Sequence, residues 1–300
     1  MADFRGGIAK RTELVYSLTV SYGEWLRNPC TFTNYVRMCV VIDNIRLQYL
    51  RFVTLRAYRM GDWRKIPIRD NGEKLVQVPN EIVFPFYSRV MKLVENERMY
   101  LREEVLKKVL DAREWLKPFG FDLKVYDGWR SVKLQENLFW FYMRAFTAGK
   151  FNQKEQFERL SDFASIKAYF ESLPPETQTV MREANRTFVS WPSKDPKAPS
   201  PHVTGGSVDV WLFENGMAAN LGVPFDWMEE NAGAFYHLKR RRSRFTGNDR
   251  KICRNRSKLI LAMANAGFSC YGPEFWHFNY GNQMDALVRG GAARYSYIEP

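Results

Sequence analysis

Cysteine and histidine are scarce in this chain of 300 residues. The four cysteines are widely spaced and form no Cys-x-x-Cys pair, so they indicate neither a structural zinc site nor a disulfide framework. We expect them to be free thiols in a reducing compartment. The only histidines are His202, His237 and His277, which leaves few candidates for any site that needs an imidazole.

Long apolar runs, internal repeats and low-complexity segments are also missing. No stretch reaches the roughly 18 apolar residues that a membrane span requires, and Glu24 and Arg27 interrupt the apolar pattern that a signal peptide needs. Hydrophobic residues still make up 45% of the chain, which is enough for a packed core. The sequence therefore predicts a globular, cytoplasmic protein without a membrane span.

The net charge of +12 is distributed unevenly. Ten basic residues and one acid, Asp249, lie between Lys239 and Lys258. Such a cluster could bind nucleic acid, an acidic membrane surface or an anionic cell-wall polymer, but a solvated helix face is the simpler interpretation. No zinc-finger spacing and no RNA-recognition motif accompanies it, so we do not expect nucleic acid as a partner.

Helical and strand patterns follow one another without regular alternation. They predict helices at 97–117, 132–146, 154–172, 176–185 and 248–265, and strands at 121–126, 207–213 and 274–280. This mixture indicates the α+β class. In this interpretation, residues 1–66 form an N-terminal helical extension and residues 67–300 form the main domain.

The first segment with metal-binding character is Ser200-Pro-His202-Val-Thr-Gly205-Gly206-Ser-Val-Asp209. On one uniform strand a histidine and an aspartate seven residues apart would point to opposite faces, but the two glycines supply a turn that lets the side chains converge. In the strand after this turn, the valines on either side of Asp209 share the core face. Asp209 therefore points into a polar cleft.

The second segment is Pro273-Glu274-Phe-Trp-His277. It is not the His-Glu-x-x-His motif of helical metalloproteases, because here a Glu and a His lie three apart at the entrance of a strand. His202, Asp209 and His277 would leave the fourth position of a tetrahedral zinc open, as a hydrolytic site requires. Each residue alone is more readily a structural or surface group, and only the combination favours a metal site.

The combination Ser-x-His-x-x-Gly-x-x-x-Asp, followed by Glu-x-Trp-His, resembles the D-alanyl-D-alanine dipeptidases of the vancomycin-resistance type. This zinc family also includes D,D-carboxypeptidases and L-alanyl-D-glutamate endopeptidases. The likeness extends from about Ile66 to Gly281 and includes Asp127-Gly-Trp-Arg130, which looks like the family's Asp-x-Tyr-Arg-Pro element, and Phe-Asp226.

The resemblance implies a mechanism and a fold. One zinc ion per chain would be held by His202, Asp209 and His277, with Glu274 as the general base and Arg130 stabilising the oxyanion. The implied fold, of the Hedgehog and D,D-peptidase type, has a central antiparallel sheet flanked by helices. The implied activity is zinc-dependent hydrolysis of D-alanyl-D-alanine.

The resemblance also assigns two residues to the substrate, a small peptide that contains D-amino acids. Asp226 would bind its free amino group and Ser200 would line the site. From the residues alone, Asp226 is equally well explained as a helix N-cap. The segment between Arg130 and His202 is longer than in a compact dipeptidase, which leaves the size of the substrate open.

Two other functions remain as alternatives. A D,D-carboxypeptidase or peptidoglycan endopeptidase of the same family would act on longer peptides. A non-catalytic protein could use the basic cluster to bind nucleic acid or an acidic partner, but such a protein would have no use for Glu274 beside three metal ligands.

Overall fold

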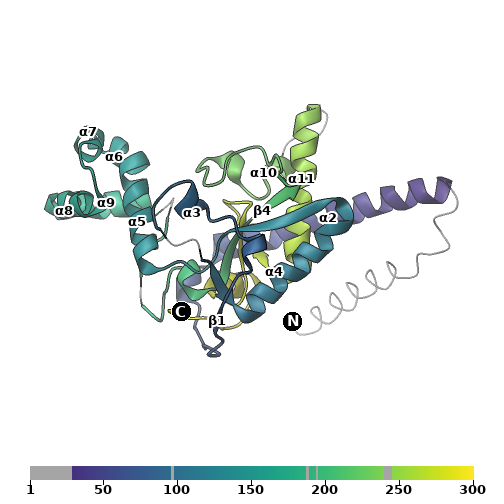
Figure 1. Cartoon of the computed structure of the whole chain (residues 1–300), viewed down its shortest axis with the longest axis horizontal. Coiled ribbons are helices and arrows are strands. Elements are labelled where there is room, and N and C mark those ends of the chain that lie inside the picture. The colour runs from purple at the N-terminus through teal and green to yellow at the C-terminus, as the bar shows by residue number, and fades with distance from the viewer. Residues whose placement is uncertain (1–28, 96–97, 187–188, 194, 240–244) are drawn as a thin grey trace. The chain divides into compact units, whose positions relative to one another are not determined.

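The computed structural model describes residues 29–95, 98–186, 189–193, 195–239 and 245–300 (Figure 1). The chain divides into two compact units, Met1–Gln48 and Tyr49–Pro300. Helix α2 (Pro29–Met60) begins in the first unit and ends in the second. The assignment of residues 1–66 to a helical extension and of residues 67–300 to a catalytic domain remains a prediction.

The second unit is built around an antiparallel sheet. Its strand order in the described part of the chain is β3-β4-β7-β6, with β5 added beside β4. The strands are β3 (Phe121–Asp127), β4 (Ser207–Glu214), β5 (Met217–Ala218), β6 (Ser269–Cys270) and β7 (His277–Asn279). A separate antiparallel pair is formed by β1 (Leu75–Gln77) and β2 (Tyr100–Arg102).

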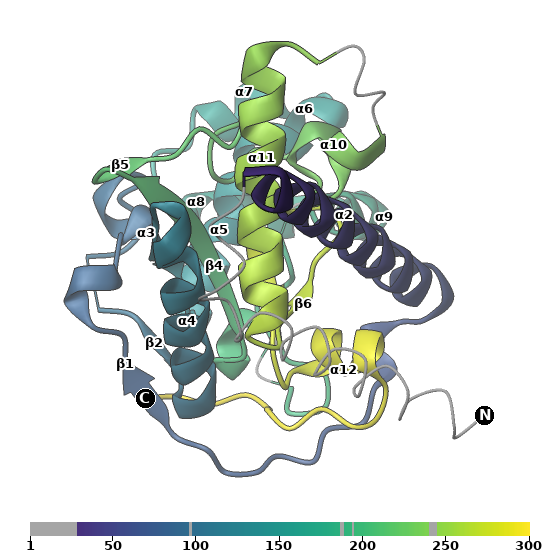
Figure 2. The ribbon, with the colours of Figure 1, turned by 90° about the vertical axis from the view of Figure 1, so that its right-hand side faces the viewer.

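One face of the sheet is apolar and the other is polar at its centre. Val210 on β4 pairs with Val125 on β3, and both side chains are buried. Helices α4 (Glu103–Leu116) and α11 (Gly247–Asn265) pack against each other and against these strands (Figure 2). The opposite side of β4 carries Asp209, as the alternation in the sequence predicts.

A β-bulge brings a second aspartate to the polar face. Regular alternation along β3 would place Asp127 on the same side as Val125. The register between β3 and β4 shifts between these two residues, so Asp127 pairs with Asp209 instead. Bulges redirect side chains in this way near functional sites.

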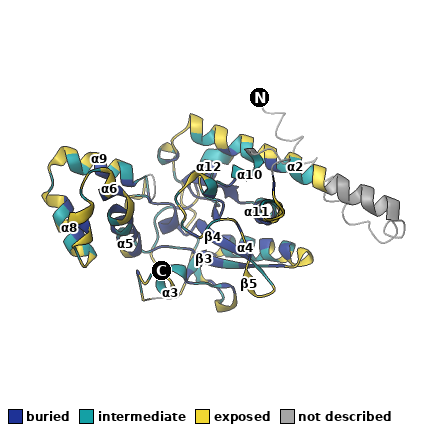
Figure 3. Cartoon of the chain, turned by 90° about the horizontal axis from the view of Figure 1, so that it is seen from above, coloured by how far each residue is buried: buried dark blue, intermediate teal, exposed yellow. Residues whose placement is uncertain are grey.

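Helices α5 to α9 lie together to one side of the sheet (Figure 1). Their bounds, with a π-helical turn η5 between the first two, are α5 (Val132–Tyr142), η5 (Met143–Thr147), α6 (Ala148–Lys150), α7 (Lys154–Glu158), α8 (Phe163–Ser172) and α9 (Pro175–Asn185). These helices form the long segment between Arg130 and His202. Much of their outer surface is exposed, whereas β3 and β4 are almost entirely buried (Figure 3).

The remaining described elements are short and connect these layers. They are η2 (Trp63–Lys65), η3 (Asn80–Ile82), α3 (Phe86–Arg89), η4 (Lys117–Phe119), η6 (His202–Thr204), η7 (Glu230–Ala232), α10 (Tyr236–Lys239) and α12 (Gln283–Arg289). Together the elements confirm the α+β class and the central antiparallel sheet flanked by helices. None of the described helices is long and apolar enough to cross a membrane.

Three predicted boundaries are wrong. The helix predicted from residue 97 begins at Glu103, where the Glu73 carboxylate accepts a hydrogen bond from the backbone N–H of Glu104. The preceding residues form β2, and the predicted cap Asn96 lies outside the described residues. The helix predicted at 154–172 is divided, because Asp162 caps a new helix by accepting from Ser165 N.

The third difference concerns the strand predicted at 274–280. Only His277–Asn279 pairs as β7, so Glu274 lies in the turn that precedes the strand. The helix predicted at 248–265 is confirmed within one residue, and Gly267 follows it at φ 97°.

Candidate active site

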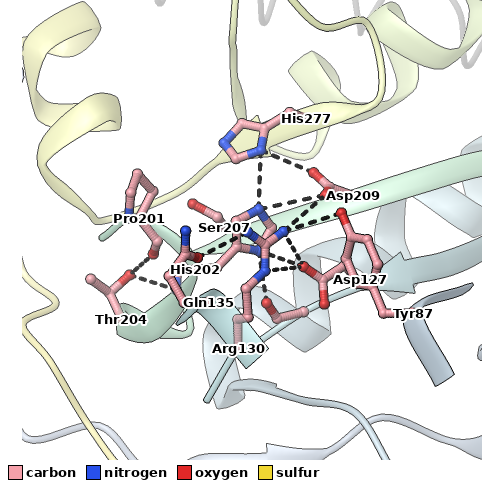
Figure 4. A network of polar contacts seen from close by, with 12 residues as sticks. Tyr87, Asp127, Arg130, Gln135, Pro201, His202, Thr204, Ser207, Asp209 and His277 are labelled. Atoms are coloured by element: carbon pink, nitrogen blue, oxygen red, sulfur yellow. Dashed lines mark hydrogen bonds and ion pairs between the residues drawn. The ribbon is translucent and has the colours of Figure 1, made fainter. Parts of the chain in front are cut away.

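Three predicted ligands converge on the polar face of the sheet. One donor atom from each of His202, Asp209 and His277 lies within 4.8 Å of the others (Figure 4). His277 Nδ1 is 2.9 Å from Asp209 Oδ1 and 3.2 Å from His202 Nε2. All three residues are buried.

The local folding of the chain explains this convergence. Asp209 and His277 are register partners on β4 and β7, so their side chains leave the sheet on the same face. His202 begins the short helix η6, which ends at Gly205 with φ 69°. At Gly206 a Cβ atom would lie 2.7 Å from the carbonyl oxygen of Tyr280, so the turn requires a glycine there.

Hydrogen bonds assign the tautomers of both histidines. His202 Nδ1 lies 2.8 Å from the carbonyl oxygen of Gly128, which can only accept, so this nitrogen carries the proton and Nε2 has the free lone pair. His277 Nε2 lies 3.1 Å from Asn279 Oδ1, which leaves the Nδ1 lone pair free. Partners of this kind orient the histidine ligands of metal ions.

The free lone pairs therefore face each other and the carboxylate of Asp209. Three electron-rich atoms at such short distances repel one another unless a cation lies among them. Burial lowers the pKa of His202, and the nearby Arg130 lowers it further. Burial also lowers the pKa of His277. Both rings are therefore neutral, and each can offer a lone pair to a metal ion. Two imidazoles and one carboxylate are a common ligand set for Zn²⁺, and the site fits this ion.

The excess of negative charge at the site also indicates a metal ion. The buried carboxyl groups of Asp127 and Asp209 lie beside one buried cation, Arg130. Burial and the charge of Asp127 raise the pKa of Asp209, and burial raises that of Asp127 despite its contact with Arg130. A bound divalent cation would lower both values and balance the charge.

Arg130 is held in place by the aspartate that the bulge turns inward. Its Nε and one terminal nitrogen lie 2.9 and 2.6 Å from Asp127 Oδ2, and the other terminal nitrogen donates to Gln135 Oε1 at 2.9 Å. The nitrogen that contacts Asp127 at 2.6 Å is also 3.9 Å from Asp209 Oδ2. The guanidinium is thus fixed beside the predicted ligands (Figure 4).

Glu274 lies next to the same cluster. Its Oε2 is 3.9 Å from His277 Nδ1, and its side chain is 19% exposed. Burial raises the pKa of the Glu274 carboxyl to about 8, while the proximity of His277 lowers it. A carboxyl group with a raised pKa next to a metal site is suited to proton transfer near neutral pH.

Asp226 occupies another part of the site. It adopts a left-handed backbone conformation, with φ 61°, in the loop after β5. The hydroxyl groups of Tyr87 and Tyr142 hydrogen-bond to its carboxylate, and burial raises its pKa to about 6. The next short helix, η7, has Glu229 at its N-cap position, so the alternative explanation of Asp226 as a helix cap is wrong.

One cavity, called here the catalytic cavity, contains six of the seven predicted site residues. Its lining includes Arg130, His202, Asp209, Asp226, Glu274 and His277. Ser200 lines a neighbouring cavity instead, and its hydroxyl donates to the carbonyl oxygen of Trp191 at 2.7 Å. Its role in substrate binding remains a prediction.

Sequence reasoning missed several residues that position this site. Asp127 was visible in the segment that resembles the family, but strand alternation alone places it on the wrong face. Asn279 follows His277 by two residues on β7 and accepts from its ring, as regular strand spacing could have indicated. Tyr87 and Tyr142 carried no sequence signal that distinguishes them from core aromatic residues.

Other sequence features lie apart from the catalytic cavity. His237 is on α10 and packs beside the rings of Tyr236 and Phe245. Part of the basic cluster, residues 240–244, lies outside the described residues. Among described cysteines, Cys253 and Cys270 are free thiols.

Comparisons with known proteins agree with the sequence resemblance. Residues 162–296 match a peptidase family described as D-ala-D-ala dipeptidase. A D-alanyl-D-alanine dipeptidase from Synechocystis sp. is 26% identical over 238 residues, which cover 73% of this chain and 86% of that protein. The resemblance to zinc peptidases of this type is thereby confirmed, and the ligand set fits the zinc ion expected for them.

One solved structure is also similar in part. A crystal structure of the vancomycin resistance D,D-pentapeptidase VanY with Zn(II) aligns with 77% of this chain and 97% of that chain. The sequence identity is 15% and the TM-score is 0.33.

Proposed function

We propose that this chain, whose residues 162–296 carry a domain of the D-Ala-D-Ala dipeptidase family, hydrolyses the free dipeptide D-alanyl-D-alanine. The observation that carries the proposal is the convergence of His202, Asp209 and His277 beside Glu274 in one buried cavity. A purely structural cluster would have no need to combine free imidazole lone pairs, a buried carboxylate and a carboxyl group with a raised pKa.

His202, Asp209 and His277 would hold the zinc ion, which when bound would polarise the scissile carbonyl and lower the pKa of a water molecule. Glu274 takes the proton from the attacking water and passes it to the departing amine. Arg130 donates to the carbonyl oxygen as negative charge develops on it. Because Asp127 and Gln135 already fix the guanidinium, little reorganisation is needed when that charge appears.

Asp226 supports a dipeptidase rather than a carboxypeptidase. A dipeptidase must bind a free ammonium group, and a buried carboxylate provides charge-assisted hydrogen bonds for it. The tyrosines at positions 87 and 142 hold this carboxylate at the wall of the catalytic cavity. A peptide with a blocked amino end would instead bring an uncharged amide to a buried anion.

A D,D-carboxypeptidase acting on longer peptides is the second candidate. It is favoured by the helices α5 to α9 and by a further cavity of about 500 Å³ that shares Met228 and Glu274 with the catalytic cavity. The two candidates differ in that only the dipeptidase requires a free amino group on its substrate. Zinc-loaded protein should be assayed with D-Ala-D-Ala and with an amino-blocked pentapeptide that ends in D-Ala-D-Ala.

Cleavage of the dipeptide alone supports the proposal, and cleavage of the pentapeptide alone would replace it with the carboxypeptidase. The proposal includes a cytoplasmic location and a small D-amino-acid peptide as the substrate. Its third competitor is a non-catalytic protein that binds nucleic acid or an acidic partner. A salt-sensitive gel shift by a protein with no peptidase activity would favour that competitor.

A further inference from the structure

A second cavity of about 330 Å³ adjoins the catalytic cavity and is rich in arginine. We call it the arginine cavity, after the three basic residues in its wall, Arg64, Arg182 and Arg186. Arg186 and Ser190 line both cavities, so the two meet at these residues. A volume of this size can hold an amino-acid side chain.

The arginine cavity lies away from the part of the catalytic cavity proposed to bind the amino group. Its lining includes none of Asp226, Tyr87 and Tyr142. It does include Ser200, which precedes the ligand His202 by two residues. A dipeptide whose ammonium group contacts Asp226 and whose scissile bond lies at the metal ligands can extend its C-terminal residue to Arg186, where the two cavities meet.

The positive charges in the arginine cavity are balanced only in part, since Arg64 is 3.8 Å from the exposed Asp62. Arg64 loses solvent on burial and is repelled by Arg186, and both effects lower its pKa. The Nε atom of Arg182 is buried and has no hydrogen-bond partner among the described residues. Its guanidinium lies 4.7 Å from the centre of the Trp191 ring. These features indicate a place for an anion.

The two acidic residues of the same wall, Glu183 and Asp195, have partners other than Arg182 and Arg64. Glu183 contacts Arg186 at 2.7 Å, but its side chain is 61% exposed. Asp195 accepts a hydrogen bond from the backbone of Lys197. Neither residue forms a described salt bridge with Arg182 or Arg64, so an incoming carboxylate can pair with these arginines.

The arginine cavity is also joined to the catalytic machinery. Gln135 donates from Nε2 to the carbonyl oxygen of Ser190 at 2.6 Å and accepts from Arg130 at 2.9 Å. The rim shared by the two cavities is therefore fixed relative to the guanidinium beside the metal ligands. A group bound in the arginine cavity would be held at a defined position relative to the scissile bond.

We propose that the arginine cavity binds a second carboxylate, carried by the side chain of the substrate's C-terminal residue. The preferred substrate is then a dipeptide that ends in an acidic residue, and D-Ala-D-Ala fills only part of the site. This inference rests on the proposed dipeptidase function, because it uses Asp226 to set the direction of the peptide.

The test measures binding separately from catalysis. The full-length Glu274→Gln variant, loaded with zinc, is titrated by calorimetry with D-Ala-D-Glu and with its uncharged isostere D-Ala-D-Gln. We expect the acidic dipeptide to bind about tenfold more tightly, which corresponds to about 1.4 kcal/mol. Adding Arg182→Gln should reduce the ratio of the two dissociation constants toward one.

Two further variants complete the experiment. Arg64→Gln removes a partly exposed arginine of the same cavity and should also lower the ratio, even if Arg182→Gln does not fold. Arg159→Gln is the matched control. Arg159 is 79% exposed, forms a salt bridge with Glu155 and does not line the arginine cavity. A ratio near one before any arginine is changed, or a ratio that Arg182→Gln and Arg64→Gln leave unaltered, overturns the inference.

Hydrolysis by the unmodified protein separates the two proposals. Cleavage of D-Ala-D-Ala without discrimination between the acidic dipeptide and its amide overturns the arginine subsite alone. Tighter binding of the acidic dipeptide without hydrolysis of any dipeptide supports the subsite and overturns the proposed activity.

Discussion

Asp209 and His277 face each other across β4 and β7, with Asp209 Oδ1 2.9 Å from His277 Nδ1. The ring nitrogen that faces the carboxylate is the one without a proton, because Nε2 is committed to Asn279. A carboxylate and an imidazole lone pair at this distance repel each other unless a proton or a metal ion lies between them. The pair is therefore suited to hold a metal ion at this point of the sheet.

Asn279 orients His277 and should affect the affinity for zinc without being a ligand. Asn279→Ala removes the acceptor for Nε2–H, and loss of such a partner typically weakens metal binding about 10–100-fold. A competition titration with a fluorescent chelator measures the change. Asn248→Ala, at an exposed position that pairs with Asn220, is the control and should leave the affinity unchanged. Equal affinities in both variants would contradict the assigned tautomer.

Glu274→Gln should retain zinc and lose activity. The amide keeps the size of the side chain but cannot accept the proton of the attacking water, so kcat should fall about 10²–10⁴-fold. Metal content by elemental analysis and kcat for D-Ala-D-Ala provide the two measurements. Unchanged turnover in a protein with a full zinc content would remove Glu274 from the mechanism.

Arg130→Ala should slow turnover and leave zinc bound. Removal of one oxyanion donor typically lowers kcat about 10²–10³-fold. The variant also leaves Asp127 as an unpaired buried charge, so its free energy of unfolding should fall by about 3–5 kcal/mol. Arg113→Ala, which breaks a more exposed pair with Asp122, controls for loss of an arginine. Loss of zinc from a folded Arg130→Ala protein would contradict the assignment.

Protonation of Asp226 should weaken binding of the dipeptide below about pH 6. Burial raises the pKa of this carboxyl to about 6, so the group is charged above that pH and neutral below it. Without the charge, the hydrogen bonds to the substrate ammonium weaken and KM rises, while kcat is less affected. The pH dependence of KM for D-Ala-D-Ala measures the effect. Asp226→Asn should have a high KM without this step, and a step that persists in the variant would assign it to another group.

Much of this site could be predicted because its ligands lie in short sequence segments with regular spacing. The alternation along β4 correctly indicated that Asp209 lies on the face opposite the buried valines. The Gly205-Gly206 turn correctly indicated that its side chain meets that of His202. The sequence could not place Asp127 on the polar face, because its orientation depends on a bulge between two strands that are distant in sequence. Tertiary pairing decides such shifts, and no local pattern records them.

The fold was predicted in class but not at several boundaries, for similar reasons. Residues before Glu103 have a helical pattern, yet they form β2 because they pair with β1 and because the buried Arg102 side chain donates to the carbonyl oxygen of Thr204. The strand that begins at His277 is shorter than predicted, and Glu274 lies in the preceding turn. That position leaves its carboxylate free to approach the ligands from outside the sheet.

The central claim is that zinc held by His202, Asp209 and His277 is required for hydrolysis of D-alanyl-D-alanine. The most direct measurement is release of D-alanine by the full-length protein with one equivalent of zinc, after removal of the metal by a chelator, and after zinc is restored. The account predicts cleavage with zinc, loss of cleavage in the chelated protein, and recovery when zinc returns. Cleavage that survives complete removal of the metal, or no cleavage by folded protein with one bound zinc, would contradict it.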